Sequence, residues 1–287
     1  MVQLPKSPVC LCSPALRTAA LLVATTACLH ATAQTVSGPG NAQAAGAAAA
    51  TSSSPSSSSS SQWGLGIGAG MSQLPYAGAD NKNSALPLLY YENAWVRVLG
   101  GTADFKVGNW PLGAASSVAL DARLKYDDAG YKPDDSPALT GMDERKGGLW
   151  GGGALTWNNP AVRASAAWTA DLSGNSKGQK LDLQLDRRFG FGNFALTPRV
   201  QAQWSDKKYV DYYFGVQAHE ALPQRAQYTG KAATTLEVGV RLDYLIQPKQ
   251  TVFLDMSARS LPDEIKRSPI VGRSSASRVA VGYLYRF

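Results

Sequence analysis

The chain has 287 residues, of which 44% are hydrophobic, 17% charged and 9% aromatic, with a formal net charge of +7. Its mean hydropathy is −0.18. No apolar run of about 18 residues occurs beyond the first thirty or so, which excludes a polytopic helical membrane protein. The 7 Trp, 12 Tyr and 7 Phe exclude a fully disordered chain. The 28 glycines favour β structure.

Residues 1–33 have the features of a secretory signal peptide. Lys6 and Arg17 supply a basic flank, and residues 15–29 are mostly small and apolar. Ala31–Ala33 forms an A-x-A cleavage site. The sequence therefore predicts export, with the mature chain beginning at residue 34.

The cysteines support this interpretation, because Cys10, Cys12 and Cys28 all lie inside the leader. The mature chain is expected to have neither disulfides nor thiolate metal sites. A lipoprotein interpretation through Cys28 is weaker, because Thr25 stands where a lipid-modified leader prefers Leu. The modest basic excess of an exported chain does not indicate nucleic acid as a partner, but it suits anionic lipopolysaccharide.

Residues 34–62 are of low complexity, with an Ala-rich stretch followed by a Ser-rich one. Such a segment has almost nothing to bury, so we expect a flexible tether. The ordered domain is predicted to span residues 63–287.

Within that domain, apolar and polar residues alternate with a period of two. In residues 236–246 the face of Leu236, Val238 and Val240 alternates with that of Glu237 and Arg241. Similar stretches predict twelve strands, at 63–72, 85–92, 95–99, 102–108, 116–126, 148–157, 161–171, 178–189, 193–205, 234–246, 250–260 and 275–287.

The strand lengths favour a transmembrane antiparallel β-barrel. Several predicted strands have 10–13 residues, whereas globular strands have about 5–6 and membrane-spanning strands need about 9–11. Aromatic residues such as Trp168 and Trp204 gather at strand ends, as interfacial girdles require. A secreted β-sandwich is the alternative. The last strand alternates as outer-membrane barrels commonly do and is expected to serve barrel assembly, through Val281, Tyr283, Tyr285 and Phe287.

Loop lengths give an independent indication. Long connections at 73–84, 127–147, 206–233 and 261–274 contrast with short ones at 158–160, 190–192 and 247–249. Long external loops and short periplasmic turns are typical of barrels. Both termini are then periplasmic and the strand count is even. Twelve strands fit, and ten is the alternative because the pair around Gly100 and Gly101 is the weakest.

An apolar face toward lipid leaves the charged face toward the lumen. The mixed signs of these residues predict ion pairs across strands that close much of a narrow barrel. The expected lumen-facing residues are Asp121, Arg123, Lys125, Arg163, Asp182, Asp186, Arg199, Glu237, Arg241, Asp243, Asp255 and Arg259.

Catalytic chemistry finds little support. The mature chain has one histidine, His219, which is expected to be a solvated loop residue, so no catalytic residue, metal site or cofactor is predicted. The carboxylates of Asp127, Asp128, Asp134 and Asp135 lack the spacing of a calcium loop and indicate a plain acidic external loop.

Two further patterns concern packing. The alternating glycines from Gly64 to Gly70 leave room for a bulky neighbour or a bend. The aromatic stretch from Tyr209 to Phe214 either folds inward as a plug or contacts a ligand, and we favour the plug.

Short motifs are spaced along the ordered region, at Pro75–Ala79, Leu86-Pro87, Leu139–Met142, Trp204, Asp206, Tyr209, Tyr213–Val216, Ser268–Val271 and Gly282–Phe287. In these motifs the region resembles the MipA/OmpV family of outer-membrane proteins. The similarity covers about residues 63–287, and the order and spacing of its motifs are more specific than any one motif. The Ser/Ala tether and the adjacent Gly100 and Gly101 depart from the family pattern.

The resemblance implies a non-enzymatic scaffold that joins a murein-degrading lytic transglycosylase to a murein synthase. It gives no catalytic residue to transfer. A porin-like passive channel for small solutes and a surface adhesin acting through loops 127–147 and 206–233 are the alternatives. Outer-membrane lipid, lipopolysaccharide and the barrel-assembly machinery are the other expected partners.

Overall fold

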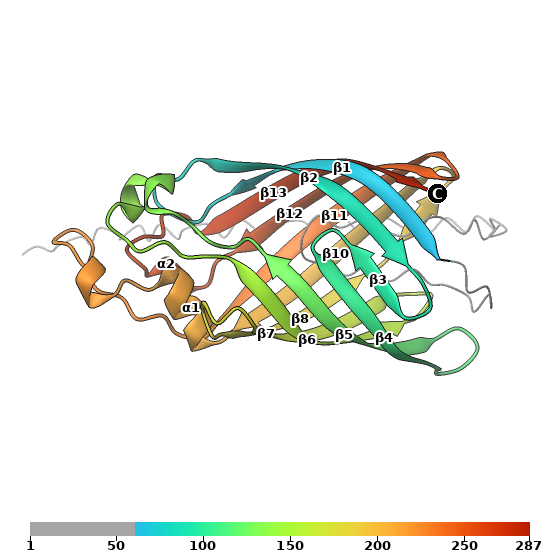
Figure 1. The fold of residues 1–287 in the computed structure, drawn as a ribbon, viewed down its shortest axis with the longest axis horizontal. Coiled ribbons are helices and arrows are strands. Elements are labelled where there is room, and N and C mark those ends of the chain that lie inside the picture. Colours follow the sequence, from blue (N-terminus) through green and yellow to red (C-terminus); the bar gives the residue numbers. More distant parts are fainter. Residues whose placement is uncertain (1–60) are drawn as a thin grey trace, which may run out of the picture. The chain divides into compact units, whose positions relative to one another are not determined.

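The computed structural model describes residues 61–287. The expected signal peptide at 1–33 and nearly all of the expected tether at 34–62 lie outside the described residues. Most of the described chain forms antiparallel strands (Figure 1). The strands are β1 (Gln62–Gln73), β2 (Asn81–Glu92), β3 (Val96–Leu99), β4 (Thr102–Pro111), β5 (Ser117–Asp127), β6 (Gly148–Asn158), β7 (Arg163–Asp171), β8 (Gln179–Asp186), β9 (Phe189–Phe191), β10 (Phe194–Ser205), β11 (Ala233–Gln247), β12 (Gln250–Ser260) and β13 (Ser275–Arg286).

Apart from β8 and β9, strands that are neighbours in sequence pair with each other, and β13 returns to pair with β1. The short β9 and the longer β8 both pair with β10, so together they occupy one strand position in the barrel wall. The sheet is therefore a closed barrel of twelve wall positions, which confirms the predicted fold and count and makes the alternative of ten wrong. No helix in residues 61–287 is long and apolar enough to cross a membrane.

The alternation of the strands determines which side chains meet lipid. On β11, Leu236 and Val238 are each 57% exposed, whereas Arg241 is 2% and Asp243 3% exposed. This inside-out distribution is what a barrel in hydrocarbon requires, since backbone groups are satisfied by strand pairing and the outer surface is apolar.

The largest differences between the observed and the predicted strands are in β2 and β8. β2 begins at Asn81, four residues before the predicted start, because polar residues continue its pairing with β1. The predicted strand at 178–189 breaks after Asp186, and the turn at 190–192 was placed too early. The chain reverses at Gly192, whose φ of 58° suits glycine.

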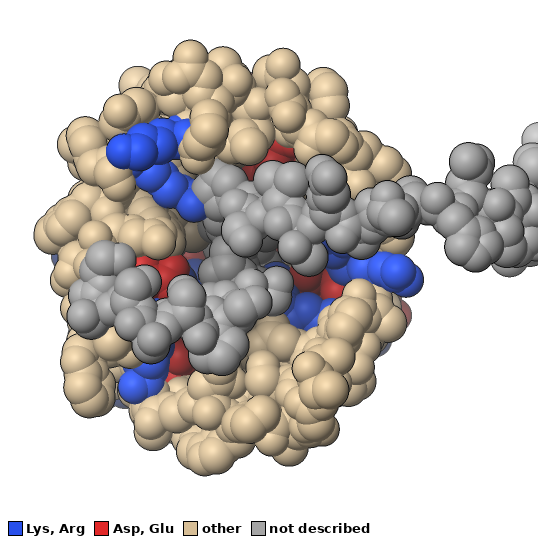
Figure 2. All heavy atoms as spheres, turned by 90° about the vertical axis from the view of Figure 1, so that its right-hand side faces the viewer, with Lys and Arg blue, Asp and Glu red and all other residues tan. Residues whose placement is uncertain are grey.

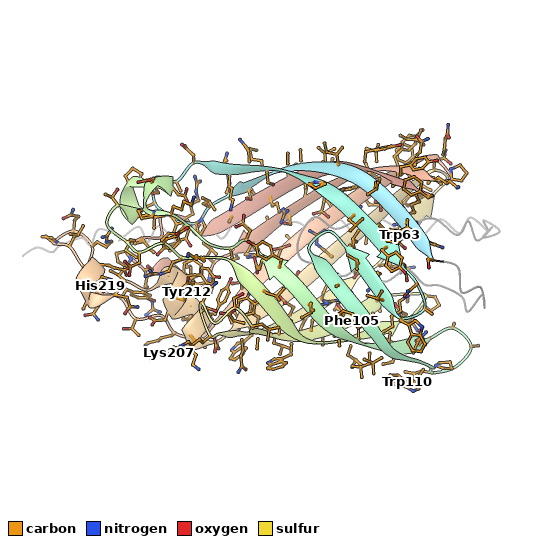
Figure 3. The ribbon with its side chains drawn as sticks, viewed as in Figure 1. Trp63, Phe105, Trp110, Lys207, Tyr212 and His219 are labelled. Carbon is orange, nitrogen blue, oxygen red and sulfur yellow. The ribbon has the colours of Figure 1, made fainter. Side chains whose placement is uncertain are left out.

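The two ends of the barrel differ. The long connections carry α1 (Lys207–Phe214), α2 (Asp263–Lys266) and the 3-10 helices η1 (Pro133–Asp135), η2 (Pro137–Leu139) and η3 (Ala218–Glu220). They gather at the end opposite the C-terminus (Figure 1). Trp63 and Trp110 lie toward the C-terminal end, and Tyr212 and His219 lie at the loop end (Figure 3).

The glycines of β1 leave room for bulky neighbours, as predicted. Their inner face is covered by a small apolar cluster that includes Leu88, Phe253 and Leu284. A Cβ placed on Gly68 would lie 3.4 Å from the Leu88 side chain, so larger residues there would crowd the cluster.

Candidate functional site

The four long connections pack together into a cap with its own apolar core. We define the cap as residues 74–80, 128–147, 206–232 and 261–274. Because these segments leave the barrel at β1, β5, β10 and β12, their meeting point covers the mouth. The core includes Tyr76, Tyr131, Leu139, Met142, Val210, Tyr213, Phe214, Val216, Leu261, Ile265 and Ile270, all buried.

The helix α1 carries the aromatic stretch into this core. Asp206 caps its N-terminus, because the side chain accepts a hydrogen bond from the Tyr209 N–H at 2.9 Å. The Ser268 hydroxyl donates to the Phe214 carbonyl oxygen at 2.6 Å, and the Tyr76 hydroxyl donates to that of Tyr213 at 3.3 Å. The prediction that this stretch folds inward is confirmed.

A buried ion pair joins two segments of the cap. Arg145 donates from Nη2 to both carboxylate oxygens of Glu220, at 2.7 and 3.0 Å, and both residues are buried. Burial would raise the pKa of Glu220, but N–H groups of Gln217 and Asp143 and the Arg145 guanidinium hold that pKa below its ordinary value. The carboxylate therefore stays ionised and fully hydrogen-bonded at neutral pH.

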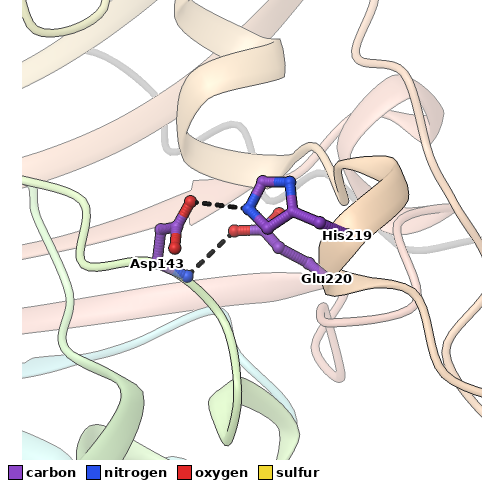
Figure 4. A group of neighbouring side chains, drawn as sticks. All are labelled: Asp143, His219 and Glu220. Carbon is purple, nitrogen blue, oxygen red and sulfur yellow. Dashed lines mark hydrogen bonds and ion pairs between the residues drawn. The ribbon is translucent and has the colours of Figure 1, made fainter.

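Beside this pair lies the one group of possible metal ligands found within residues 61–287. It consists of Asp143, His219 and Glu220, and Figure 4 shows them converging. His219 Nε2 lies 2.8 Å from Asp143 Oδ2, and both side chains are more than half exposed. The histidine is thus solvated, as predicted, although its contact with Asp143 was not foreseen.

The chemistry of this group does not favour a metal. Glu220 Oε1 already accepts from Asp143 N–H at 2.9 Å, and Oε2 accepts from Gln217 N–H at 2.8 Å. With Arg145 also bound, the carboxylate would have to lose hydrogen bonds to become a ligand. Two exposed ligands would remain, fewer than a zinc site needs.

Three carboxylates of the expected acidic loop each bind a different partner. Asp127 turns inward to Lys180 Nζ at 2.7 Å, and Asp128 pairs with Lys82 Nζ at 2.7 Å. Asp135 accepts from the Lys132 N–H at 2.7 Å. These carboxylates do not form one cation site.

The inside of the barrel holds ion pairs arranged on rungs of the sheet. Asp104 lies between Arg97 at 2.9 Å and Arg123 at 2.7 Å, on one rung of β3, β4 and β5. Arg163 and Asp186 face each other on β7 and β8 at 2.8 Å. Cross-strand neighbours of opposite charge thus neutralise each other inside the wall.

A second set of pairs crosses β11. Arg199 on β10 donates to both carboxylate oxygens of Asp255 on β12, at 2.8 and 2.9 Å. Its guanidinium passes over Gly239, where a Cβ would lie 2.6 Å from Arg199 Cζ. A Cβ at this position would force the guanidinium to shift, so Gly239 on the intervening strand leaves room for the bridge.

The remaining predicted residues also lie on the inner face. Arg259 binds Glu237 at 3.0 Å, and Arg241 binds Asp243 at 2.8 Å. Asp182 accepts from the side-chain amides of Gln201 and Gln203. Asp121 and Lys125 take part in no ion pair found in residues 61–287. Basic and acidic side chains are visible inside the ring of other residues at the C-terminal end (Figure 2).

Sequence reasoning missed several inner-face residues. Asp104 was overlooked because a bulge between Lys106 and Gly108 interrupts the alternation of β4. Lys180, which is 2% exposed and lies 3.7 Å above the Trp150 ring, stands two positions before Asp182. Its period-two relation to Asp182 was the available signal.

A closed barrel with an apolar outside, a charged inside and aromatic residues at its ends defines an outer-membrane β-barrel protein. The match to the family of MltA-interacting protein MipA covers residues 65–287. The chain belongs to this family, as the resemblance implied, and it is an outer-membrane protein.

Named relatives agree with this assignment. The chain is 27% identical over 221 residues to YiaT of Escherichia coli K12, which is named as an outer membrane protein, covering 75% of this chain and 87% of that one. It is 24% identical to the MltA-interacting protein of the same strain, covering 76% and 87%. Among solved structures, the NanC porin is similar at a TM-score of 0.39 and 10% identity, covering 77% and 98%.

Proposed function

We propose that this protein is a non-enzymatic barrel, closed at its outer mouth, that serves as a scaffold for murein-remodelling enzymes through its periplasmic end. The partners are a lytic transglycosylase and, bound together with it, a murein synthase. The observation that carries the proposal is the cap, whose apolar core covers the mouth opposite the C-terminus. A sealed outer end leaves the periplasmic end as the surface for partners.

Two further observations support it. A relative at 24% identity is named for interaction with MltA. The C-terminal end of the barrel exposes large apolar side chains at its turns, with Trp95 76% and Leu112 60% exposed. Leu112 lies in the turn beyond β4, and such apolar positions are typical of interfaces.

The test is photo-cross-linking in cells from a reactive amino acid at position 112. We expect adducts that contain a lytic transglycosylase, and co-purification of a murein synthase with them. The matched control is position 222 in the cap, where Leu222 is 44% exposed at the opposite end. Absence of both enzymes from position-112 adducts, or equal yields from both positions, would contradict the proposal.

A passive channel for small solutes is the second candidate, favoured by the charged inner face. The ion pairs of Arg199, Asp255 and their neighbours would then set its selectivity. Conductance of the full chain in planar bilayers separates the two candidates. Steady openings would support the channel, and a folded but silent barrel, identified by heat-modifiable gel mobility, would favour the scaffold.

A further inference from the structure

The wall of the barrel is incomplete next to β2. β3 has four residues, and its hairpin with β4 reverses at Gly100 and Gly101. Consequently β2 pairs with β3 only over Tyr90–Glu92, although it pairs with β1 along its whole length. Residues 81–88 of β2 have no strand on that side within the described chain. In hydrocarbon the unpaired backbone N–H and C=O groups of such an edge cost free energy. We therefore expect particular residues to determine where the pairing of β2 stops.

Pro87 explains where the pairing stops. The Gly100 N–H donates to the Leu89 carbonyl oxygen at 3.0 Å, so the peptide groups of Leu89 point toward the hairpin. Peptide groups two residues apart in a strand point the same way, and the ring nitrogen of Pro87 therefore faces the same side. Because proline has no N–H, the ladder cannot continue there, and one orphan donor is removed from the edge.

The gap lies at the level of the lipid-facing band. Pro87 is opposite Ile67 in the register, and Ile67 is 64% exposed on the outer surface. The hairpin tip bounds the gap on one side. On the other, Lys82 Nζ binds Asp128 Oδ2 at 2.7 Å and joins β2 to the segment after β5. We call this gap the lateral window.

A hollow of about 630 Å³ adjoins the window. It is lined by residues 69–71, 83–85 and 279–281, which lie side by side on β1, β2 and β13. Most of its lining side chains point outward and are exposed, including Met71, Val279 and Val281, so the hollow opens toward lipid. On the inner face of the same rung lie Gly70, Ser84 and Ala280, all small. Ser84 is exposed although it points inward, which places open space directly at the edge of β2.

The inner face beside the window has an amphipathic order. The next rung toward the cap places Lys82 and Arg278 on either side of Ser72. Arg278 also faces the carboxylates of Asp255 and Glu237. Toward the other end of the barrel lies the buried apolar cluster of Leu88, Tyr90, Phe253 and Leu284. Cationic side chains therefore lie toward the cap, and apolar side chains lie toward the C-terminal end of the barrel.

We propose that the lateral window admits a single-chain anionic amphiphile, of the fatty-acid kind, from the lipid-facing hollow past Ser84 into the barrel. Its head would lie near Lys82 and its acyl chain along the window toward the apolar cluster. The cap covers the axial route from outside, so a molecule dissolved in the membrane reaches the interior sideways. This site is independent of the scaffold proposal, which concerns the periplasmic turns.

Access through the window is tested with a fluorescent label at Ser84→Cys, in a full chain whose Cys10, Cys12 and Cys28 are replaced by serine. In vesicles containing nitroxide-labelled acyl chains we expect strong quenching. The matched control is Ser165→Cys, which has the same parent residue on the inner face of β7 with paired strands on both sides. Ala69→Cys on the outer face gives the fully lipid-exposed value. Quenching at 84 no greater than at 165 would overturn the proposal.

The preference for an anionic head is tested on the same label with doxyl-stearate and its methyl ester at alkaline pH. We expect the acid to quench at several-fold lower concentration than the ester. Lys82→Gln should abolish that difference. Asp128→Asn, which breaks the same ion pair but keeps the cation, should preserve it. Equal potency of acid and ester in the parent protein, or loss of the difference in both variants, would overturn the role of Lys82, and heat-modifiable mobility reports folding in every case.

Discussion

The cap and the barrel bury their residues in opposite ways. In the cap, Leu139 and Val210 are completely buried, as in a soluble protein. In the barrel, Val238 is 57% exposed while Arg241 is 2% exposed. The same chain therefore contains one region ordered by burial away from water and one ordered by burial away from lipid.

Buried ion pairs therefore have different surroundings in the two regions, and breaking them has different costs. Inside the barrel, ion pairs such as Arg163–Asp186 occupy the only face that lipid does not touch. In the cap, Arg145 and Glu220 are placed within apolar surroundings, where an uncompensated charge is costly. We therefore expect cap and barrel to lose structure separately, each through its own kind of substitution.

The largest expected effect is that of Arg145→Met. The change leaves the buried Glu220 carboxylate without its cation and should destabilise the cap by about 3–5 kcal/mol. Hydrogen exchange should show faster exchange in α1, while the strand amides stay protected and the gel mobility stays that of a folded barrel.

The matched control is Arg267→Met, which removes an exposed arginine of the same cap whose contact with Asp263 is 3.9 Å long. No measurable change in α1 exchange is expected from it. Loss of protection in the strands of the Arg145 variant would show instead that cap and barrel form one cooperative unit.

Substitutions in the barrel should depend on the face they occupy. Val238→Arg places a cation on the lipid face near the middle of β11 and should cost about 2–4 kcal/mol. Gln203→Arg, on the inner face beside the Asp182 carboxylate, should cost clearly less. Denaturant titration of refolding into vesicles measures both, and equal costs would mean that the two faces are not distinguished by lipid.

The strand pattern of the barrel was predictable because the inside-out alternation is a local property of the sequence. The alternation runs without interruption from Leu236 to Tyr244, and these residues form part of one strand. The predicted strand ends are wrong where pairing with a neighbouring strand, and not the local pattern, determines the strand. Asn81 and Asn83 lie on one face and Lys82 and Ser84 on the other. Because all four are polar, the start of β2 carries no period-two signal and is set by pairing with β1.

The cap and the window were beyond such reasoning. The pair of Arg145 and Glu220 joins residues 75 apart in loops without periodicity. The window depends on a short hairpin and on Pro87, whose effect emerges only when its neighbours in the sheet are known. Long-range side-chain contacts in loops leave no local pattern, whereas strands do.

A pH titration sharpens the comparison from the cap side. The pKa of Glu220 is lowered in the folded cap, so its ionised form contributes stability above the ordinary glutamate pKa of about 4.3. That contribution should be lost as the pH falls through the lowered value, opening α1 to exchange before the strands. The effect should be smaller than that of Arg145→Met, because a neutral acid still accepts the N–H hydrogen bonds. Glu220→Gln should remove the pH dependence, and an unchanged dependence in that variant would assign it to another carboxyl group.

The smallest effect is expected from His219→Ala, one residue from Glu220. The His219 and Asp143 side chains are 65% and 62% exposed, so their contact at 2.8 Å is solvated and its loss should cost about 0.5 kcal/mol or less. Added zinc should change the exchange of α1 in neither the parent nor the variant, since the hydrogen bonds of Glu220 leave only two available ligands. Stabilisation by zinc that disappears in His219→Ala would show that the ion draws Glu220 away from Arg145, and that the cap, unlike the barrel, contains a metal site. If zinc does not stabilise the cap, the different effects of substituting His219 and Glu220 follow from their burial alone.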